Sequence, residues 1–191
     1  MMMETKFRFF LALIGGAFVL AGCGQAAATG APVSEDKGEP AADFELSVYY
    51  GAAALGGETV QFSDVLAQGK PVVLNFWAAL CPACRVEMPD LQALYEEFEG
   101  RILVVGVDIG PFTSLGTRES GRALLKELGV TYPTGTTFES EVVINYRVIG
   151  MPTTHFITPE GEIVETWTGF LTKGKMTELV EELLVASGVA P

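Results

Sequence analysis

The chain has 191 residues and a formal net charge of −12 at pH 7, with 12 Lys and Arg against 24 Asp and Glu. This acidity excludes nucleic acid as a partner, because phosphate binding needs a basic face. It also excludes adsorption to anionic lipid by charge alone. The length fits a single domain. Three cysteines are too few for a disulfide scaffold, and one histidine excludes a His-rich metal site.

Residues 1–22 have the features of an export signal. Lys6 and Arg8 precede an apolar run that is shorter than the ~20 residues of a membrane span. The run ends in Leu20–Cys23 (LAGC), which resembles a bacterial lipobox. We therefore predict a lipoprotein signal peptide over residues 1–22 and a lipidated Cys23; an ordinary signal peptide is the alternative. The protein would then be extracytoplasmic and anchored to the bacterial cell membrane.

The remaining chain divides into a linker and a domain. Residues 24–42 are rich in Ala, Gly and Pro and lack an apolar period, so residues 23–42 are predicted as the lipidated cysteine and a flexible linker. The folded domain is predicted over residues 43–191.

Apolar patterns in the domain alternate between strand and helix types. Ser63 is predicted to cap a short helix through Ala67. Continuous apolar runs at residues 71–77 and 102–108 predict strands that are buried on both faces. Further strands are predicted at residues 44–50, 59–62, 153–158 and 163–168, and helices at residues 82–98, 118–128, 139–146 and 173–187.

Cys81-Pro82-Ala83-Cys84 opens the helix that follows the first buried strand. Positions i and i+3 bring Cβ atoms to roughly 5–6 Å, from which a disulfide can close. The helix dipole and the unpaired amides of the first turn favour a thiolate, so Cys81 is the predicted nucleophile, with a lowered pKa. Cys84, one turn deeper, is the predicted resolving thiol. Pro82 costs no hydrogen bond in the first turn.

Two other interpretations of the cysteine pair remain open. A structural zinc needs four ligands, but only Cys81, Cys84 and His155 would remain after Cys23 is lipidated. A static disulfide is the second, although closing so short a loop stabilises a fold little. We expect a redox-active disulfide, with no metal and no cofactor.

The chain from about Phe44 to Val185 resembles the thioredoxin-like superfamily, in particular the membrane-anchored TlpA/ResA/CcmG-type thiol–disulfide oxidoreductases. Trp77 and Pro89 stand four residues before and eight residues after Cys81, as in that family. Gly150–Thr154 (GMPTT) matches its cis-proline loop and Pro159–Gly161 (PEG) the hairpin turn that follows. The resemblance implies an α/β fold, a three-layer α/β/α sandwich with a central mixed sheet and an N-terminal β-hairpin extension.

The resemblance also implies a substrate-binding surface. A cis Pro152 would turn the backbone of Met151 outward, where family members pair with an extended stretch of substrate. Trp77, Pro82, Met151 and Pro152 are the implied substrate-binding residues.

Glu87 is the implied proton-handling residue, because ResA-type proteins carry a glutamate three residues beyond the second cysteine. Such a carboxylate raises thiol pKa values and can exchange a proton with Cys84. An exposed helix glutamate is the alternative. Asn75 occupies the position of the buried aspartate of cytoplasmic thioredoxins, which leaves Glu87 as the better candidate.

Leu80 and Met151 depart from the family pattern, and both departures concern the choice of partner. Leu80 replaces the common tryptophan before the first cysteine, and Met151 stands where many relatives have a small, β-branched or other aliphatic residue. His155 is predicted to be a packed or edge-strand histidine and not a catalytic residue. The polar loop at residues 112–118 is predicted to border the site.

We predict a monomeric protein-disulfide reductase. Its expected partners are a disulfide-containing protein, with apocytochrome c the family's commonest substrate, and a membrane-embedded thiol electron donor. A peroxiredoxin-type peroxidase is one alternative, although Ala78 and Leu74 replace the threonine and proline of that pattern. A Cu(I)-binding chaperone that uses the two thiolates and Met151 is the other, although the relatives that do this have a longer cysteine spacing and a distant histidine.

Overall fold

The computed structural model describes residues 31–32 and 38–189. The strands among them form one sheet in the order β1-β8-β7-β4-β5-β6-β2-β3. The predicted signal peptide and Cys23 lie outside the described residues. At the centre, β4 (Val72–Trp77), β5 (Leu103–Asp108) and β6 (Thr134–Thr136) are parallel. On the other side of β4, β7 (Thr153–Ile157) runs antiparallel to it and pairs with β8 (Ile163–Thr168). The sheet is therefore mixed, as predicted.

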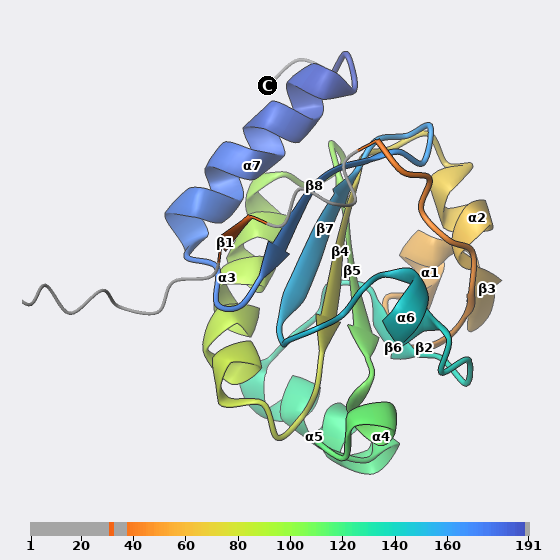
Figure 1. The fold of residues 1–191 in the computed structure, drawn as a ribbon, viewed down its shortest axis with the longest axis vertical. Helices are drawn as coiled ribbons and strands as arrows, with labels where there is room; N and C mark the ends of the chain where they lie inside the picture. The colour runs from red at the N-terminus through yellow and green to blue at the C-terminus, as the bar shows by residue number, and fades with distance from the viewer. Residues whose placement is uncertain (1–30, 33–37, 190–191) are drawn as a thin grey trace, which may run out of the picture.

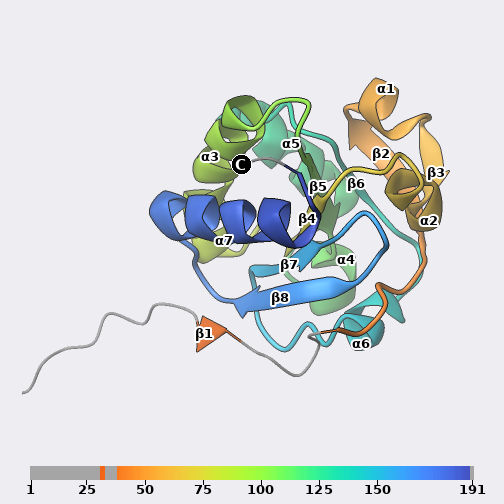
Figure 2. The ribbon, with the colours of Figure 1, turned by 90° about the horizontal axis from the view of Figure 1, so that it is seen from above.

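Helices cover both faces of this sheet (Figures 1 and 2). Every residue of β4 and β5 is buried, which explains their uninterrupted apolar runs. On one face, α3 (Pro82–Glu97), α5 (Arg118–Leu128) and α7 (Lys173–Ala186) pack over Val73 and Trp77. On the other, α2 (Phe62–Leu66) and α6 (Val142–Asn145) cover Leu74 and Phe76. The predicted three-layer sandwich is confirmed.

The N-terminal hairpin extends the sheet beyond β6. Its strands are β2 (Glu45–Tyr50) and β3 (Thr59–Gln61), and β2 pairs antiparallel with β6. A short helix that the sequence did not predict, α1 (Ala52–Leu55), connects the two strands. The hairpin extension is confirmed, with this helix as an addition.

Two predicted helix boundaries are wrong. Gln61, not Ser63, precedes α2; Ser63 lies inside the helix, where its amide and hydroxyl donate to the carboxylate of Asp43 at 2.8 and 3.0 Å. A side chain from the preceding segment thus satisfies the first turn. The predicted helix at residues 139–146 shortens to α6; Glu139 lies before it, and its side-chain carboxylate accepts the amide of Glu45 at 2.8 Å.

Residues before the predicted domain start at residue 43 also pair with the sheet. The amides of Gly38 and Ala41 donate to the carbonyls of Ile163 and Gly161, both at 2.8 Å. Further upstream, β1 (Ala31–Pro32) pairs with the end of β8. Part of the predicted linker therefore lies against the β7–β8 hairpin. Within the described residues, no helix has both the length and the apolar character to cross a membrane.

Candidate active site

The two predicted redox cysteines meet at the start of α3. Strand β4 ends at Trp77, and a short turn leads to Cys81, which is the N-cap residue of α3. Cys81 and Cys84 form a disulfide with their Cα atoms 5.3 Å apart. The amide of Cys84 lies 3.2 Å from Sγ of Cys81 as a donor. A first-turn amide is thus aimed at the sulfur, which is the geometry that stabilises a thiolate after reduction.

Exposure distinguishes the two sulfur-bearing residues. Cys81 retains 5% of its surface and Cys84 only 1%. Leu80 and Pro82 on either side of Cys81 are exposed, with Leu80 at 62%. An incoming group therefore reaches Cys81 first, and Cys84 is shielded behind it.

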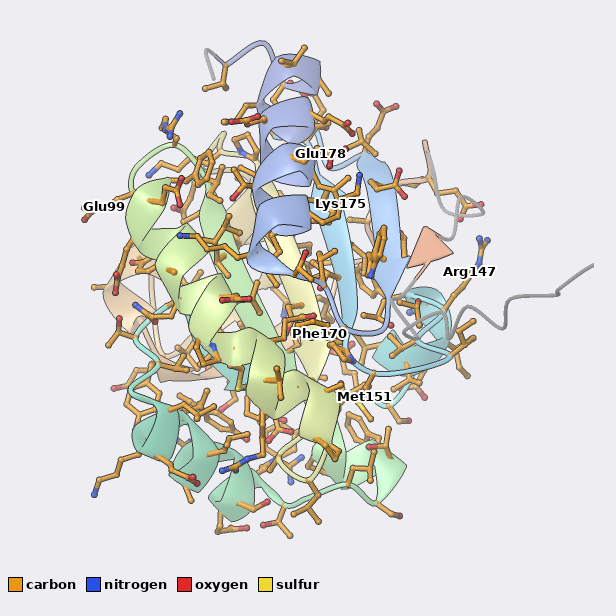
Figure 3. All side chains as sticks on the ribbon, turned by 90° about the vertical axis from the view of Figure 1, so that its left-hand side faces the viewer. Glu99, Arg147, Met151, Phe170, Lys175 and Glu178 are labelled. Atoms are coloured by element: carbon orange, nitrogen blue, oxygen red, sulfur yellow. A yellow bond between two sulfur atoms is a disulfide. The ribbon has the colours of Figure 1, made fainter. Side chains whose placement is uncertain are left out.

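The cis-proline loop faces the disulfide. The Met151–Pro152 peptide bond is cis, as the resemblance implied. The carbonyl oxygen of Met151 lies 3.7 Å from Sγ of Cys81, and the carbonyl of Pro152 accepts the amide of Gly169 at 2.8 Å. Met151 is half-buried and lies beside the beginning of α3 (Figure 3). Chain segments far apart in sequence thus form one rim around the disulfide.

Glu87 is buried rather than exposed, with 1% of its surface accessible. Its carboxylate accepts hydrogen bonds from Asn75 Nδ2 at 3.0 Å and from the amide of Leu171 at 2.6 Å. Burial raises the pKa of Glu87 to about 8, although both hydrogen bonds act in the opposite direction. Asn75 also donates to Thr154 Oγ1 at 2.9 Å. A proton-binding group with a pKa near that of a thiol therefore lies one turn beyond Cys84.

The structure places Trp77 beneath the site and not on its surface. Its side chain is fully buried, so a docked protein cannot contact it. The indole packs beneath the site, where Gly106 on β5 and Gly121 on α5 leave room for it. The burial of this last residue of β4 makes Trp77 a packing residue. Pro82 is exposed beside Cys81 and Met151 is half-buried, whereas Pro152 is buried next to Met151.

The polar loop at residues 112–118 borders the site, as predicted. It contains the end of an unpredicted short helix, α4 (Gly110–Thr113), and its Leu115 carbonyl accepts the amide of Leu80 at 2.8 Å. The sequence analysis missed Asp108, the fully buried last residue of β5, which precedes this segment. An acid that ends an apolar strand run was the signal that could have identified it.

His155 packs in the core on the face opposite α3, as predicted. Its ring contacts Phe76 and Tyr146, and Nδ1 lies 2.8 Å from Thr166 Oγ1. Burial lowers the pKa of His155 to about 4, so the ring is neutral at physiological pH. In the part of the chain that the structure describes, no group of three or more His, Cys, Asp or Glu is placed to hold a metal ion.

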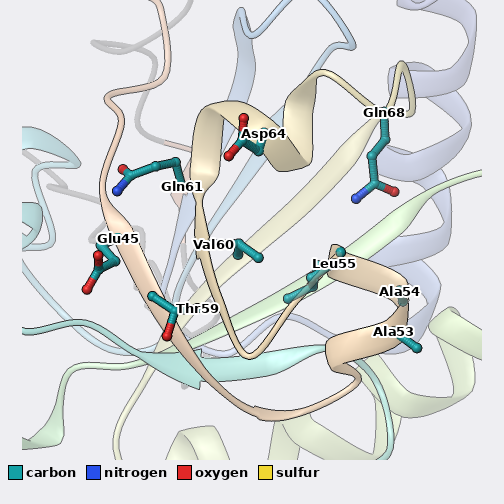
Figure 4. A pocket seen from close by; sticks show the side chains of 10 residues that line it. Glu45, Ala53, Ala54, Leu55, Thr59, Val60, Gln61, Asp64 and Gln68 are labelled. Carbon is teal, nitrogen blue, oxygen red and sulfur yellow. The ribbon is translucent and has the colours of Figure 1, made fainter.

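A pocket of about 480 Å³ lies elsewhere, at the hairpin edge of the sheet (Figure 4). It is lined by apolar Leu55 and Val60 and by polar side chains such as Glu45, Gln61 and Asp64. Strands β5, β6 and β2 separate this edge from β4, so the pocket does not belong to the disulfide site.

Comparison with known proteins agrees with this geometry. The AhpC/TSA family model matches residues 37–166. Thiol-disulfide oxidoreductase ResA of Oceanobacillus iheyensis is 36% identical over 146 residues, which are 76% of this chain and 72% of that protein. Thioredoxin-like protein YneN of Bacillus subtilis is 33% identical over 150 residues, 78% of this chain and 81% of that one.

Two solved structures share the fold. The exposed lipoprotein thioredoxin of Streptococcus pneumoniae superposes with a TM-score of 0.60 at 28% identity, covering 74% of this chain and 99% of that one. A protein of Chlorobium tepidum described as a thiol:disulfide interchange protein DsbE gives a TM-score of 0.64 at 25% identity, covering 80% and 97%. The chain therefore belongs to the AhpC/TSA family and is a thioredoxin-like thiol–disulfide oxidoreductase of the ResA type.

Proposed function

We propose that the protein reduces disulfides of partner proteins outside the cytoplasm, with Cys81 as nucleophile and Cys84 as resolving thiol. The Cys81 thiolate attacks a substrate disulfide, forms a mixed disulfide and expels one substrate thiolate, which takes up a proton. Cys84 then attacks Sγ of Cys81 and expels the second substrate sulfur as a thiolate, which takes up a proton from water. The two electrons that reduce the substrate come from the enzyme dithiol, which ends as the Cys81–Cys84 disulfide.

The observation that carries this proposal is the position of Cys81. It caps α3, receives a first-turn amide, and its Sγ lies 3.7 Å from the carbonyl oxygen of Met151. A substrate strand that pairs with the backbone of Met151 would bring its own sulfur to Cys81. The exposed Leu80 beside it supports a partner with apolar residues next to its cysteines.

Glu87 is proposed to hold the proton that Cys84 loses. An ionised Glu87 accepts this proton as Cys84 attacks, and the carboxyl is neutral in the oxidised enzyme. Its pKa of about 8, with the disulfide closed, supports this assignment, because this value is close to the ordinary pKa of a cysteine thiol. Re-reduction returns the proton to Cys84.

The setting of the reaction belongs to the same proposal. Lipidation of Cys23 would anchor the domain, and a membrane-embedded thiol donor would re-reduce it. Apocytochrome c is the proposed substrate class, since its paired cysteines must be reduced before haem attachment. The buried proton acceptor supports reduction as the physiological direction.

The test is to trap the mixed disulfide. Cys84→Ser should accumulate a covalent complex with a cytochrome c apoprotein peptide that carries its disulfide, and Cys81→Ser should form none. Absence of the complex in Cys84→Ser, with wild-type protein that fails to reduce the same peptide, would reject the proposal. Identification of partners trapped in cells then tests the substrate class.

A peroxide assay separates the peroxidase alternative. Position 78 is a buried alanine, so no side-chain hydroxyl at this position can orient a peroxide against Cys81. We expect slow peroxide consumption in wild-type protein. Rapid consumption that persists in Cys84→Ser but not in Cys81→Ser would favour the peroxidase instead.

A further inference from the structure

Asp108 ends β5 beside Trp77, the last residue of β4, and its side chain is fully buried. Oδ1 accepts the amide of Gly110 at 2.9 Å, and Oδ2 lies 3.4 Å from the hydroxyl of Tyr49. Gly121 on α5 packs so closely that a methyl group there would overlap Oδ2. Burying a carboxylate costs free energy, and these hydrogen bonds offset that cost.

A series of backbone hydrogen bonds leads from Asp108 to the nucleophile. The amide of Gly110 donates to the Asp108 carboxylate, and the carbonyl of Gly110 accepts the amide of Leu115 at 3.2 Å. The carbonyl of Leu115 accepts the amide of Leu80 at 2.8 Å, and Leu80 directly precedes Cys81. The Gly110–Leu115 segment therefore joins the buried acid to the turn that carries Cys81. In Figure 1, α4 lies at the same end of the molecule as the β4–α3 connection.

Tight packing leaves this segment little freedom. A Cβ atom at Gly110 would lie 3.4 Å from Cβ of Ala78, and one at Gly116 would lie 3.1 Å from Cβ of Ala79. Both alanines belong to the active-site turn. A shift of the segment must therefore move that turn, because the two are in contact and share the Leu80–Leu115 hydrogen bond.

We propose that Asp108 is a positioning residue that sets the reactivity of Cys81 from outside the disulfide, by holding the Gly110–Gly116 segment against the Ala78–Leu80 turn. This inference relies on the proposed function only in taking Cys81 as the nucleophile. Asp108 touches neither sulfur nor substrate in this mechanism. It acts through the backbone of the loop.

Because Asp108 can ionise, the reactivity of Cys81 should depend on pH through it. Burial raises the pKa of Asp108 to about 6, while the amide of Gly110, the hydroxyl of Tyr49 and the charge of Arg118 lower it. Arg122 lies over the ring of Tyr49 at 4.0 Å, so two cations of α5 surround the acid and its partner. Thr136 on β6 donates instead to the main-chain carbonyl of Asp108 at 2.8 Å. The pKa of Asp108 therefore depends on these partners, and removing one of them should shift it.

The test compares Asp108→Ala, Asp108→Asn and Tyr49→Phe with the control Asp64→Ala, which removes an exposed acid on α2. Two readouts need no substrate protein: amide exchange of Leu80, and the pH profile of Cys81 alkylation by iodoacetamide in the reduced enzyme. Asp108→Ala should speed Leu80 exchange and change the alkylation rate by about tenfold, the size expected for the loss of one buried hydrogen bond. Asp64→Ala should leave both unchanged.

The milder variants keep the test decisive if Asp108→Ala does not fold. In the wild type, titration of Asp108 should give the alkylation profile an inflection near pH 6. Asp108→Asn retains an acceptor for the amide of Gly110, so the amide of Leu80 should stay protected from exchange. The same variant has no carboxyl to titrate, so the inflection should disappear. Tyr49→Phe should shift that inflection upward, because a donor to the carboxylate is lost. Profiles of both variants that overlay the wild type would overturn the inference. Failure to trap a mixed disulfide would affect only the proposed function.

Discussion

The carboxylate of Glu87 accepts the amide of Leu171 at 2.6 Å, which joins the cysteine helix to the loop between β8 and α7. Two residues earlier in that loop, Gly169 donates to the carbonyl of the cis proline, Pro152. One buried acid is therefore connected to both walls of the disulfide site, the helix that carries Cys84 and the loop that faces Cys81. Its ionisation should influence both.

Glu87→Gln should slow turnover while leaving the first attack intact. The amide keeps an oxygen for Leu171 but cannot accept the proton of Cys84. Resolution of the mixed disulfide should slow by about a hundredfold, within the usual range for loss of general acid–base catalysis. Rapid-quench measurement should show the mixed disulfide accumulating, and the rate profile should lose its dependence on a group with a pKa of about 8.

The matched control for this variant is Glu99→Gln. Glu99 is exposed and lies at the end of α3 away from Met151 (Figure 3). Glu99→Gln also replaces a carboxyl group by an amide in the same region of the sequence, but it does so away from the site. Equal effects of the two substitutions would show that net charge, and not proton transfer at Glu87, controls the rate.

Glu87 also predicts how stability depends on pH. Its pKa is about 8 in the folded protein and 4.5 in the reference state, so the folded state binds the extra proton between these values. Stability should fall as pH rises from about 4.5 to about 8, by on the order of 5 kcal/mol from this group. Urea unfolding of the oxidised protein at pH 5, 7 and 9 should show this loss in wild type and a flatter profile in Glu87→Gln. Parallel profiles would contradict it.

The sequence predicted the elements that local chemistry determines. The all-apolar runs of β4 and β5 identified buried strands, and Gly129, in the left-handed region at φ 66°, ends α5 at the predicted residue. Cys81 and Cys84 were located because their spacing and helix position act together. These signals lie within a few residues of one another, so they can be read without the fold.

What the sequence did not predict depends on distant partners. Strand β6 is only Thr134–Thr136, and it exists because β5 and β2 pair with it on either side. The first turn of α2 is satisfied by Asp43, twenty residues before Ser63. The burial of Trp77 and the carboxylate contacts of Asp108 also arise from tertiary packing. No local pattern carries that information.

Leu80 offers a test of partner recognition that should spare the fold. Its side chain is 62% exposed, so Leu80→Asp should change the free energy of unfolding by no more than about 0.5 kcal/mol. An acidic group beside Cys81 should raise KM for a partner with apolar flanking residues. Its negative charge should also raise the pKa of the Cys81 thiol. Val185→Asp is the control, since Val185 on α7 is 66% exposed. Equal KM values for the two variants would remove Leu80 from the docking surface.

The junction between the hairpin extension and the sheet depends on Gly135. A Cβ atom at this position would overlap the backbone carbonyl of Ser47 on β2, which cannot move without breaking its pairing with β6. Gly135→Ala should therefore lower the free energy of unfolding by about 2–4 kcal/mol, measured by urea denaturation. Gly174→Ala in α7 is the matched control, because no atom lies within 4 Å of the added methyl group. It should be neutral or stabilising by up to about 1 kcal/mol, since alanine favours a helix. If both variants unfold at the same urea concentration, close packing of β6 against β2 does not hold the hairpin in place.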